Sequence, residues 1–164
     1  MYVWARLVRV GLTALFKRRL GFLEESVVTF VVSPFDLDAY LHMNNGRYLT
    51  IMDLGRLDLM QRCGLASLAL KHRWQPVVGE VNVSYRKALR LFSRFRLRTR
   101  VMGWRNDWLY IQTVFENGGA EVTRAVVRMV VLGPGRKKVP IGEVAQALGH
   151  SGESPLLPSN LQKP

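Results

Sequence analysis

The stretch from Tyr48 to Met60 constrains the fold more than any other part of the chain. Eight of its thirteen residues are large and apolar, and they are spread around most of the circumference of a helix. A surface helix carries one apolar stripe, whereas a helix that is apolar nearly all round is covered on most sides. Asn44 or Asn45 can cap its start, and Gly64 can close its end in the left-handed conformation. We therefore expect the rest of the chain to wrap around this helix.

Short β-branched or alternating runs flank the helix on both sides. One run precedes it at 26–33, and four follow it at 77–85, 92–104, 108–116 and 121–132. The joints at 105–107 and 117–119 are short and contain Asn, Asp or Gly, which is typical of antiparallel hairpins. This order predicts an α+β fold in which one antiparallel sheet curls around the buried helix. Residues 65–75 form a connector of unassigned shape, and 140–148 are expected to form a short helix.

Length and charge restrict the classes of function. The 164 residues, 48% of them hydrophobic, suit one domain with a real core. Cys63 is the only cysteine, so no intrachain disulfide forms and a reducing, cytoplasmic setting is expected. The formal net charge of +12 favours anionic partners. Because no basic and aromatic recognition motif accompanies that charge, we expect no nucleic-acid partner. No Walker-type or dinucleotide-binding glycine loop and no Gly-x-Ser-x-Gly motif occurs.

The chain begins with a basic amphipathic segment, residues 1–22. Apolar side chains recur at helical spacing in it, at Trp4, Leu7, Val8, Leu12, Leu15 and Phe16. Arg6 and Arg9 interrupt the apolar run, which argues against a membrane-spanning helix. Two interpretations stay open: residues 1–20 lie on a membrane surface, or the helix packs on its own domain or on a partner subunit. The expected organisation is this helix, a main domain over 23–150, and a loose tail rich in Ser and Pro over 151–164.

A row of arginines alternates with buried-type residues in the run 92–104. Arg94, Arg96, Arg98 and Arg100 are expected on one face of a strand, opposite Phe95, Leu97, Thr99 and Val101. Such a row can bind phosphates, but it more often forms a solvated outer face or meets acids across a subunit contact.

Candidate chemistry is concentrated just before the central helix. Asp36, Asp38 and His42 crowd its start, where free N–H groups and a partial positive charge can stabilise negative charge on a substrate oxygen. A carboxylate there can attack a carbonyl or take a proton from water. In an extended segment the two aspartates, two residues apart, would project toward the same side. No second histidine or cysteine cluster supports a metal, since His72 and His150 stand alone, so we predict no metal and no cofactor.

The same residues carry a resemblance to a known family. The pattern Asp36-x-Asp38-x-x-x-His42-x-Asn44-Asn45-x-x-Tyr48 closely resembles the start of the central helix in hotdog-fold acyl thioesterases. That superfamily includes the 4-hydroxybenzoyl-CoA thioesterase group and the plant acyl-ACP thioesterases. The segment HMNN-x-RYL and a following YR-x-ALR, here residues 85–90, are similar to a thioesterase-like branch. The resemblance covers roughly residues 26–132 and implies the hotdog fold, a sheet wrapped around a long central helix.

The resemblance also implies roles for individual residues. Asp38 matches the catalytic carboxylate, acting as nucleophile or as general base, and Asp36 is not expected to carry the reaction. His42 matches a histidine that orients substrate or moves protons. Asn45 and Gly46 open the helix, where backbone N–H groups polarise the thioester carbonyl. Tyr48 matches a pocket aromatic, and Asp53 matches an acid one turn on that can also pair with Arg56. Beside the resemblance, we expect Ile51 and Met52 to line the substrate pocket with Tyr48. The basic charge suits CoA phosphates, which Arg136, Lys137 and Lys138 or the strand arginines can contact.

The chain departs from the plant pattern at three positions. Tyr40 stands where those enzymes have Asn, and neither Ser84 nor Ala88 supplies the acid they carry near the Tyr-Arg pair. The expected function is hydrolysis of fatty or aromatic acyl thioesters, with acyl-CoA or acyl-ACP as substrate. The alternative is a non-hydrolytic acyl-CoA-binding or membrane-surface scaffold. The resemblance implies a homodimer or a tetramer of dimers with a site shared across the interface. The cysteine usage and the basic first segment lead us to expect a cytoplasmic protein, either free or bound to a membrane.

Overall fold

The computed structural model describes residues 2–161, and the elements keep the order expected from the sequence. The helices are α1 (Tyr2–Phe16), α2 (Asn45–Arg62), α3 (Leu65–His72) and α4 (Ile141–Ala147). The strands are β1 (Ser26–Val31), β2 (Gln75–Tyr85), β3 (Arg94–Arg105), β4 (Trp108–Asn117), β5 (Ala120–Leu132) and β6 (Lys138–Val139). Short 3₁₀ turns lie at Pro34–Asp36, Pro134–Arg136 and Ser159–Leu161.

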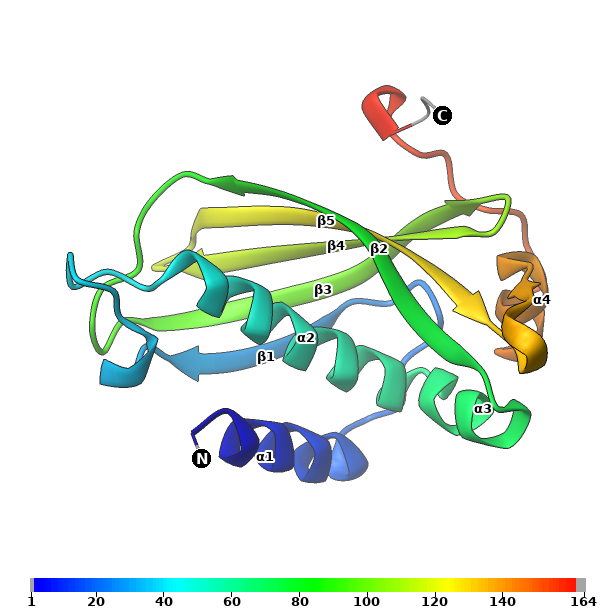
Figure 1. Ribbon diagram of the computed structural model, residues 1–164, viewed down its shortest axis with the longest axis horizontal. Coiled ribbons are helices and arrows are strands. Elements are labelled where there is room, and N and C mark those ends of the chain that lie inside the picture. Colours follow the sequence, from blue (N-terminus) through cyan, green and yellow to red (C-terminus); the bar gives the residue numbers. More distant parts are fainter. Residues whose placement is uncertain (1, 162–164) are drawn as a thin grey trace.

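The strands form one antiparallel sheet that curls around α2. Its order is β1-β3-β4-β5-β2, with β6 added beside β5. Both expected hairpins are confirmed, because Arg105 pairs with Trp108 and Asn117 pairs with Ala120 across their turns. Figure 1 shows α2 lying across one face of the curved sheet, while β2 runs obliquely across β4 and β5 as the sheet curls. The predicted α+β arrangement is therefore confirmed.

A glycine lets α2 approach the sheet closely. A Cβ atom on Gly55 would lie 2.6 Å from Leu97 Cδ2 and 2.6 Å from Thr99 Oγ1, a distance that side chains do not tolerate. The helix is buried along most of its length, at Tyr48, Ile51, Met52, Leu54, Gly55, Arg56, Asp58 and Leu59. This burial all round the helix is what its sequence predicted.

The alternation predicted for β3 is also confirmed. Phe95, Leu97, Thr99 and Val101 are all buried against α2 and the neighbouring strands. On the other face, Arg96 pairs with Glu116, and Arg98 pairs with both Glu25 and Glu116. Acids of the same chain thus meet these two arginines. The row lies on an outer face of the sheet, and two of its four cations are neutralised within the chain.

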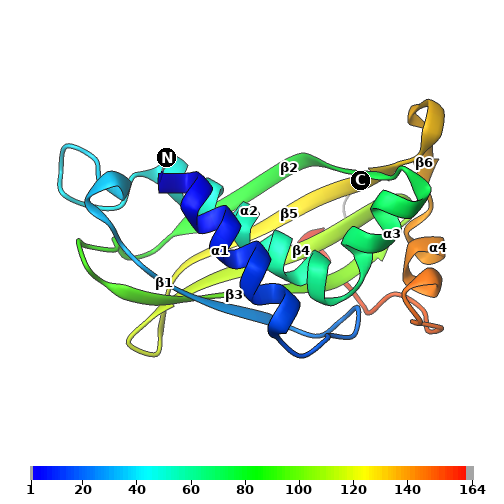
Figure 2. The same cartoon turned by 90° about the horizontal axis from the view of Figure 1, so that it is seen from below.

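Helix α1 packs against α2, as Figure 2 shows most clearly. Val10 and Ala14 are buried beneath it, and Val10 belongs to the same core cluster as Tyr48. Lys17 lies at the end of α1 and pairs with the fully buried Asp58 of α2 at 2.8 Å. The inner face of α1 thus packs on the chain's own domain, while the membrane interpretation concerns its outer face and stays a prediction. These residues share the core with the main domain and do not form a separate unit.

Asp58 ties three elements together inside the protein. Besides Lys17, it accepts hydrogen bonds from Arg62 Nη1 at 3.1 Å and from Ser26 Oγ at 2.6 Å. Two cations and a hydroxyl compensate the desolvation of this carboxylate, as buried charges require. The cluster joins α1, α2 and the start of β1.

The tail is not loose as far as residue 161, so that expectation was wrong for most of its length. The backbone N–H of Trp104 donates to Ser154 Oγ at 2.7 Å, and Leu157 is buried. Gly103 makes room for this contact, since a Cβ there would lie 2.8 Å from the carbonyl oxygen of Pro155. One apolar anchor and one backbone hydrogen bond hold the segment against β3. Residues 162–164 lie outside the described range.

Two elements were not anticipated. Residues 65–72 form α3, which starts after Gly64 adopts φ of +89° and turns the chain away from α2. Leu65 then buries itself among the residues around Leu59, so tertiary contact stabilises this short helix. The two-residue strand β6 extends the sheet beside the end of β5.

Candidate active site

The loop before α2 separates the two aspartates into different environments. Asp36 is 1% exposed and accepts two hydrogen bonds from the Arg6 guanidinium, at 2.9 and 3.1 Å. It also accepts from the backbone N–H of Ser33 at 2.9 Å, which completes the cap of the turn at Pro34–Asp36. Asp36 therefore holds the loop onto α1. The expectation that both carboxylates project to the same side was wrong, because the segment turns at this point instead of running extended.

Asp38 is only partly buried and keeps part of its carboxylate unengaged. Its Oδ1 accepts from the backbone N–H of Tyr40 at 2.9 Å and of His42 at 3.3 Å, which folds residues 38–42 into a tight turn. Leu41 adopts φ of +58° within that turn, and Asp38 N–H donates back to the His42 carbonyl at 2.8 Å. Within residues 2–161, no hydrogen bond or ion pair to Oδ2 is found. The carboxylate is thus held in place by one oxygen and offers the other for chemistry.

Asp38 lines a pocket of about 250 Å³ at the start of α2. The wall comes from the loop before α2, from its first turns and from the end of β2: Asp38, His42, Met43, Asn45, Tyr48, Tyr85, Arg86, Lys87 and Ala88. Four of the residues predicted from the resemblance therefore border one cavity, namely Asp38, His42, Asn45 and Tyr48, whereas Gly46 is not part of its wall. The sequence had not assigned roles to Tyr85, Arg86 and Lys87. The signal was their membership in the YR-x-ALR segment, which was noted only as part of the resemblance.

The two backbone N–H groups expected to polarise a carbonyl, those of Asn45 and Gly46, differ in whether they already have a hydrogen-bond acceptor. Asn44 is the cap, and its Oδ1 accepts from the N–H of Gly46 at 2.8 Å. Among the described residues, no acceptor is found for the N–H of Asn45, which lies at the positive end of the helix. Asn45, rather than Gly46, thus presents the available donor. The Tyr85 hydroxyl donates to the Asn45 carbonyl oxygen at 3.3 Å and ties the end of β2 to this turn.

Two tyrosines form the back of the pocket. The rings of Tyr48 and Tyr85 meet edge to face with centroids 5.2 Å apart, and Tyr48 meets Phe115 in the same way at 5.0 Å. The Tyr48 hydroxyl accepts from the backbone N–H of Leu89 at 3.2 Å. Burial raises the pKa of Tyr48 and also that of Tyr85. Both phenols therefore stay protonated at neutral pH and act as hydrogen-bonding walls rather than as bases.

The remaining predicted residues lie elsewhere. Ile51 and Met52 are fully buried in the core behind Tyr48 and do not border the cavity, because the helix turns them toward the sheet. Asp53 pairs with Arg56 on the same helix, as its spacing allowed. Arg136, Lys137 and Lys138 lie in the turn before β6 and at its start, and none of them borders the pocket. Figure 2 shows β6 at the end of the molecule opposite the loop that leads into α2.

The three residues that depart from the plant pattern lie in different surroundings. Tyr40 is exposed on the loop, and Ser84 is exposed on β2. Ala88 borders the pocket itself, so its methyl group takes the place of any acid on that wall. Among the described residues, no group of three or more His, Cys, Asp or Glu side chains is arranged to hold a metal ion.

A family model described as the thioesterase-like superfamily matches residues 32–148, which include the whole pocket. The chain belongs to this superfamily. Its sheet and central helix are the hotdog fold, as the similar solved structures show. One is the probable thioesterase YbaW from Escherichia coli, with a TM-score of 0.71 and 20% identity over 76% of this chain and 96% of the other. Another is a DHNA-CoA thioesterase from Staphylococcus aureus, with a TM-score of 0.64 and 17% identity over 79% and 95%.

A curated relative is similar over part of its length. Protein THEM6 of Danio rerio is 38% identical over 93 residues, which make up 57% of this chain and 46% of the relative. The chain thus spans about half the length of such relatives. The structural likenesses lie at or below 20% identity and show the fold, so the chemistry has to be argued from the pocket.

Proposed function

We propose that the protein hydrolyses acyl thioesters, with acyl-CoA as the favoured substrate, in the pocket at the start of α2. One observation carries the proposal: an aspartate with a free carboxylate oxygen and a helix-terminal N–H without an acceptor line the same cavity. Thioester hydrolysis needs a group that attacks and a group that stabilises the oxyanion. Asp38 and Asn45 supply these two groups.

The reaction follows from their placement. The Asn45 N–H donates to the thioester carbonyl oxygen, and the positive end of α2 stabilises the charge that develops there. Asp38 Oδ2 then either attacks the carbonyl carbon, which expels the thiolate and leaves a mixed anhydride that water cleaves, or takes a proton from water as the water attacks. Both routes yield a carboxylic acid and a thiol. His42 borders the pocket and is placed to pass a proton to the departing sulfur.

The charge around the pocket supports a phosphate-bearing thiol such as CoA. Lys87 borders the cavity and is exposed, and no ion-pair partner for it is found within residues 2–161. Arg86 also borders it, although it pairs with Glu121 at 3.3 Å. The Staphylococcus aureus neighbour is named for a CoA thioester. A cation at the mouth and an apolar wall behind it match the two ends of an acyl-CoA molecule.

We propose that two copies complete the site along strand β2. This strand of eleven residues has no neighbour on its outer side in the sheet order, and Val77, Val78 and Val81 are exposed on it. A long apolar edge strand is a template for pairing with another chain. A cavity of 250 Å³ is also small for a drug-sized ligand, whose sites span roughly 300–1,000 Å³. A second copy would add the missing wall.

The residues expected to contact CoA phosphates lie far from Asp38 of their own copy. Two-fold pairing along β2 would bring them nearer to Asp38 of the other copy. Antiparallel pairing sets the Tyr85 end of one strand beside the Gln75 end of the other. Gln75 pairs with Leu132, which in turn pairs with Lys138. Lys138 pairs on the side of β5 away from β2, so the pairing would bring Arg136, Lys137 and Lys138 to the same end of the dimer as the other copy's pocket, one strand back from the β2 edge.

The second candidate is the non-hydrolytic acyl-CoA-binding scaffold. The observation that favours it is Ala88, which leaves the pocket wall without the acid found in plant enzymes. A screen of short, long and aromatic acyl-CoAs with detection of the released thiol separates the two. The proposal predicts turnover of at least one class. Tight binding of acyl-CoA with no turnover of any class would instead establish the scaffold.

The proposed dimer has its own test. Val81→Lys places a charge on the pairing edge without touching the pocket, so it should lower the mass measured by light scattering and weaken acyl-CoA hydrolysis together. Leu70→Lys is the matched control, because Leu70 is an exposed residue of α3 away from β2. A monomeric wild type with full activity would contradict the shared site.

A further inference from the structure

Helix α1 exposes an apolar face directly opposite the face that packs on α2. Trp4 is 69% exposed and Phe16 is 88% exposed. The full set on this outer face is Trp4, Val8, Leu12, Leu15 and Phe16. Scattered apolar residues on a surface are ordinary, but five large ones along one helix form a contiguous patch that marks an interaction site. The helix is thus apolar toward the core and apolar toward solvent.

The inner side of α1 fixes this patch outward. Arg6 is 8% exposed, and its guanidinium donates to the Asp36 carboxylate. It also donates to the Val31 carbonyl oxygen, at 2.6 Å. Val10 sits in the core, and Lys17 pairs with buried Asp58. Turning the outer face inward would break these contacts at once. The patch is therefore a permanent surface of the folded protein.

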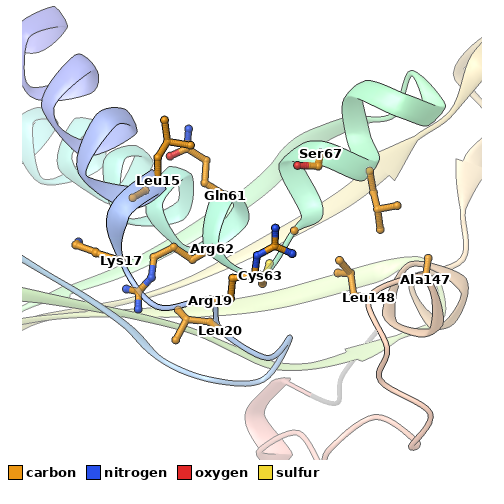
Figure 3. Close-up of a pocket in the computed structure, with 13 residues that line it drawn as sticks. Leu15, Lys17, Arg19, Leu20, Gln61, Arg62, Cys63, Ser67, Ala147 and Leu148 are labelled. Carbon is orange, nitrogen blue, oxygen red and sulfur yellow. The ribbon is translucent and has the colours of Figure 1, made fainter.

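The surroundings of the patch are cationic. Residues 2–23 contain five basic side chains and no acid, although Arg6 pairs with Asp36 and Arg18 pairs with Glu24. Beside Leu15 lies a cavity of about 560 Å³, between the end of α1, the α2–α3 junction and Leu148 (Figure 3). Lys17, Arg19 and Arg62 line it, and none of its lining residues is acidic. Asp58 pairs with Lys17 and Arg62, whereas no acidic partner for Arg19 is found in the described part of the chain.

We propose that the outer face of α1 docks the protein onto an anionic lipid surface. The helix would lie flat, with its five apolar side chains in the acyl boundary and Arg19 at the level of the negative headgroups. None of the helices in the range 2–161 is long and apolar enough to cross a membrane. Charge complementarity selects lipid over a second copy, because a second copy would bring another cationic rim against the first. Docking here leaves the β2 edge and the Asp38 pocket on other elements.

Vesicle sedimentation of the full chain tests this inference. Wild type should pellet with phosphatidylcholine vesicles that contain phosphatidylglycerol, should pellet far less with phosphatidylcholine alone, and should be released by salt. Leu12→Gln combined with Phe16→Gln should reduce partitioning by about tenfold or more, because two large side chains no longer enter the lipid. Leu156→Gln is the matched control, since Leu156 is 96% exposed but lies outside α1, and it should partition as wild type does.

Two further measurements test how α1 is oriented on the lipid surface and what covers its outer face. Tryptophan emission should shift to the blue on anionic vesicles, and Trp4→Phe should remove that shift while the protein still sediments. Arg19→Glu should weaken binding and its dependence on salt. Equal binding to neutral vesicles, or unchanged binding of the Leu12 and Phe16 variant, would overturn the proposal. A fall in the mass of that variant in solution, with no lipid binding by wild type, would assign the face to a second copy instead.

Discussion

The buried pair between Arg6 and Asp36 offers a sharp test of how the loop before α2 is held. Asp36→Asn keeps the shape of the side chain but removes its charge. The Arg6 guanidinium would then remain 8% exposed without a carboxylate, and an amide N–H₂ group would face it on one side. Removing one partner of a buried ion pair costs about 3–5 kcal/mol, because the other charge stays desolvated.

The magnitude can be checked by a double-mutant cycle. Asp36→Asn should lower the free energy of unfolding in urea by about 3–5 kcal/mol, equivalent to roughly 6–20 °C in melting temperature for a chain of this size. Arg6→Met removes the cation and fills the same space. In its presence Asp36→Asn should cost about 1–3 kcal/mol less than it does alone, which is the coupling expected of residues in contact.

Two results would refute this reasoning. A loss below about 1 kcal/mol for Asp36→Asn would mean that the pair is solvated or not formed. Additive losses in the double variant would mean that the residues do not interact. In either case α1 would not position the loop before α2, and the separation of roles proposed for Asp36 and Asp38 would lose its structural basis.

Three further tests, with five substitutions in all, examine other parts of the account by urea unfolding. Asn44→Ala should cost about 1 kcal/mol as the loss of a helix cap, and Asn45→Ala should cost clearly less, so the reverse order would move the helix start. Gly55→Val should destabilise by about 1–3 kcal/mol or more because the helix cannot back away from β3, and a neutral result would contradict the close approach. Leu157→Ala should cost about 2–5 kcal/mol while Leu156→Ala stays near neutral, whereas equal small effects would show that the tail is not docked.

Periodicity predicted the elements that carry their own pattern. Tyr48 to Met60 is apolar all round, and the run around Phe95 alternates strictly, so each shows its environment locally. The hairpins followed from Asn and Gly at the turns. Helix α3 lacked such a signal, because only the burial of Leu65 in the core stabilises it.

Contacts between distant residues were beyond the reach of the sequence. Arg6 lies 30 positions before Asp36, and nothing local shows that they pair. The apolar spacing of α1 predicted amphipathicity, yet it could not show that Val10 faces the core while Leu12 faces outward. Likewise, Tyr85 reaches Asn45 across 40 positions, through the curl of the sheet.

The resemblance selected residues that lie together in the structure, but it did not predict their individual contacts. Asp38, His42 and Asn45 meet in one pocket, and these residues lie within a single short loop and helix start. Asn44 accepts from the Gly46 N–H because it, and not the adjacent Asn45, caps the helix. The burial of Ile51 and Met52 depends on how deeply α2 sits in the sheet. Both features depend on tertiary packing, which the sequence pattern does not show.

The most direct test of the central claim is the hydrolysis of acyl-CoA by Asp38→Asn, with binding of a non-hydrolysable thioether analogue measured in parallel. An asparagine still accepts from the N–H groups of Tyr40 and His42, so the fold and the binding should remain. Turnover should fall by about 10²–10⁴-fold, the contribution of a positioned acid or base. Unchanged turnover in Asp38→Asn, or an equal loss in a folded Asp36→Asn protein, would contradict the assignment of the reaction to this carboxylate.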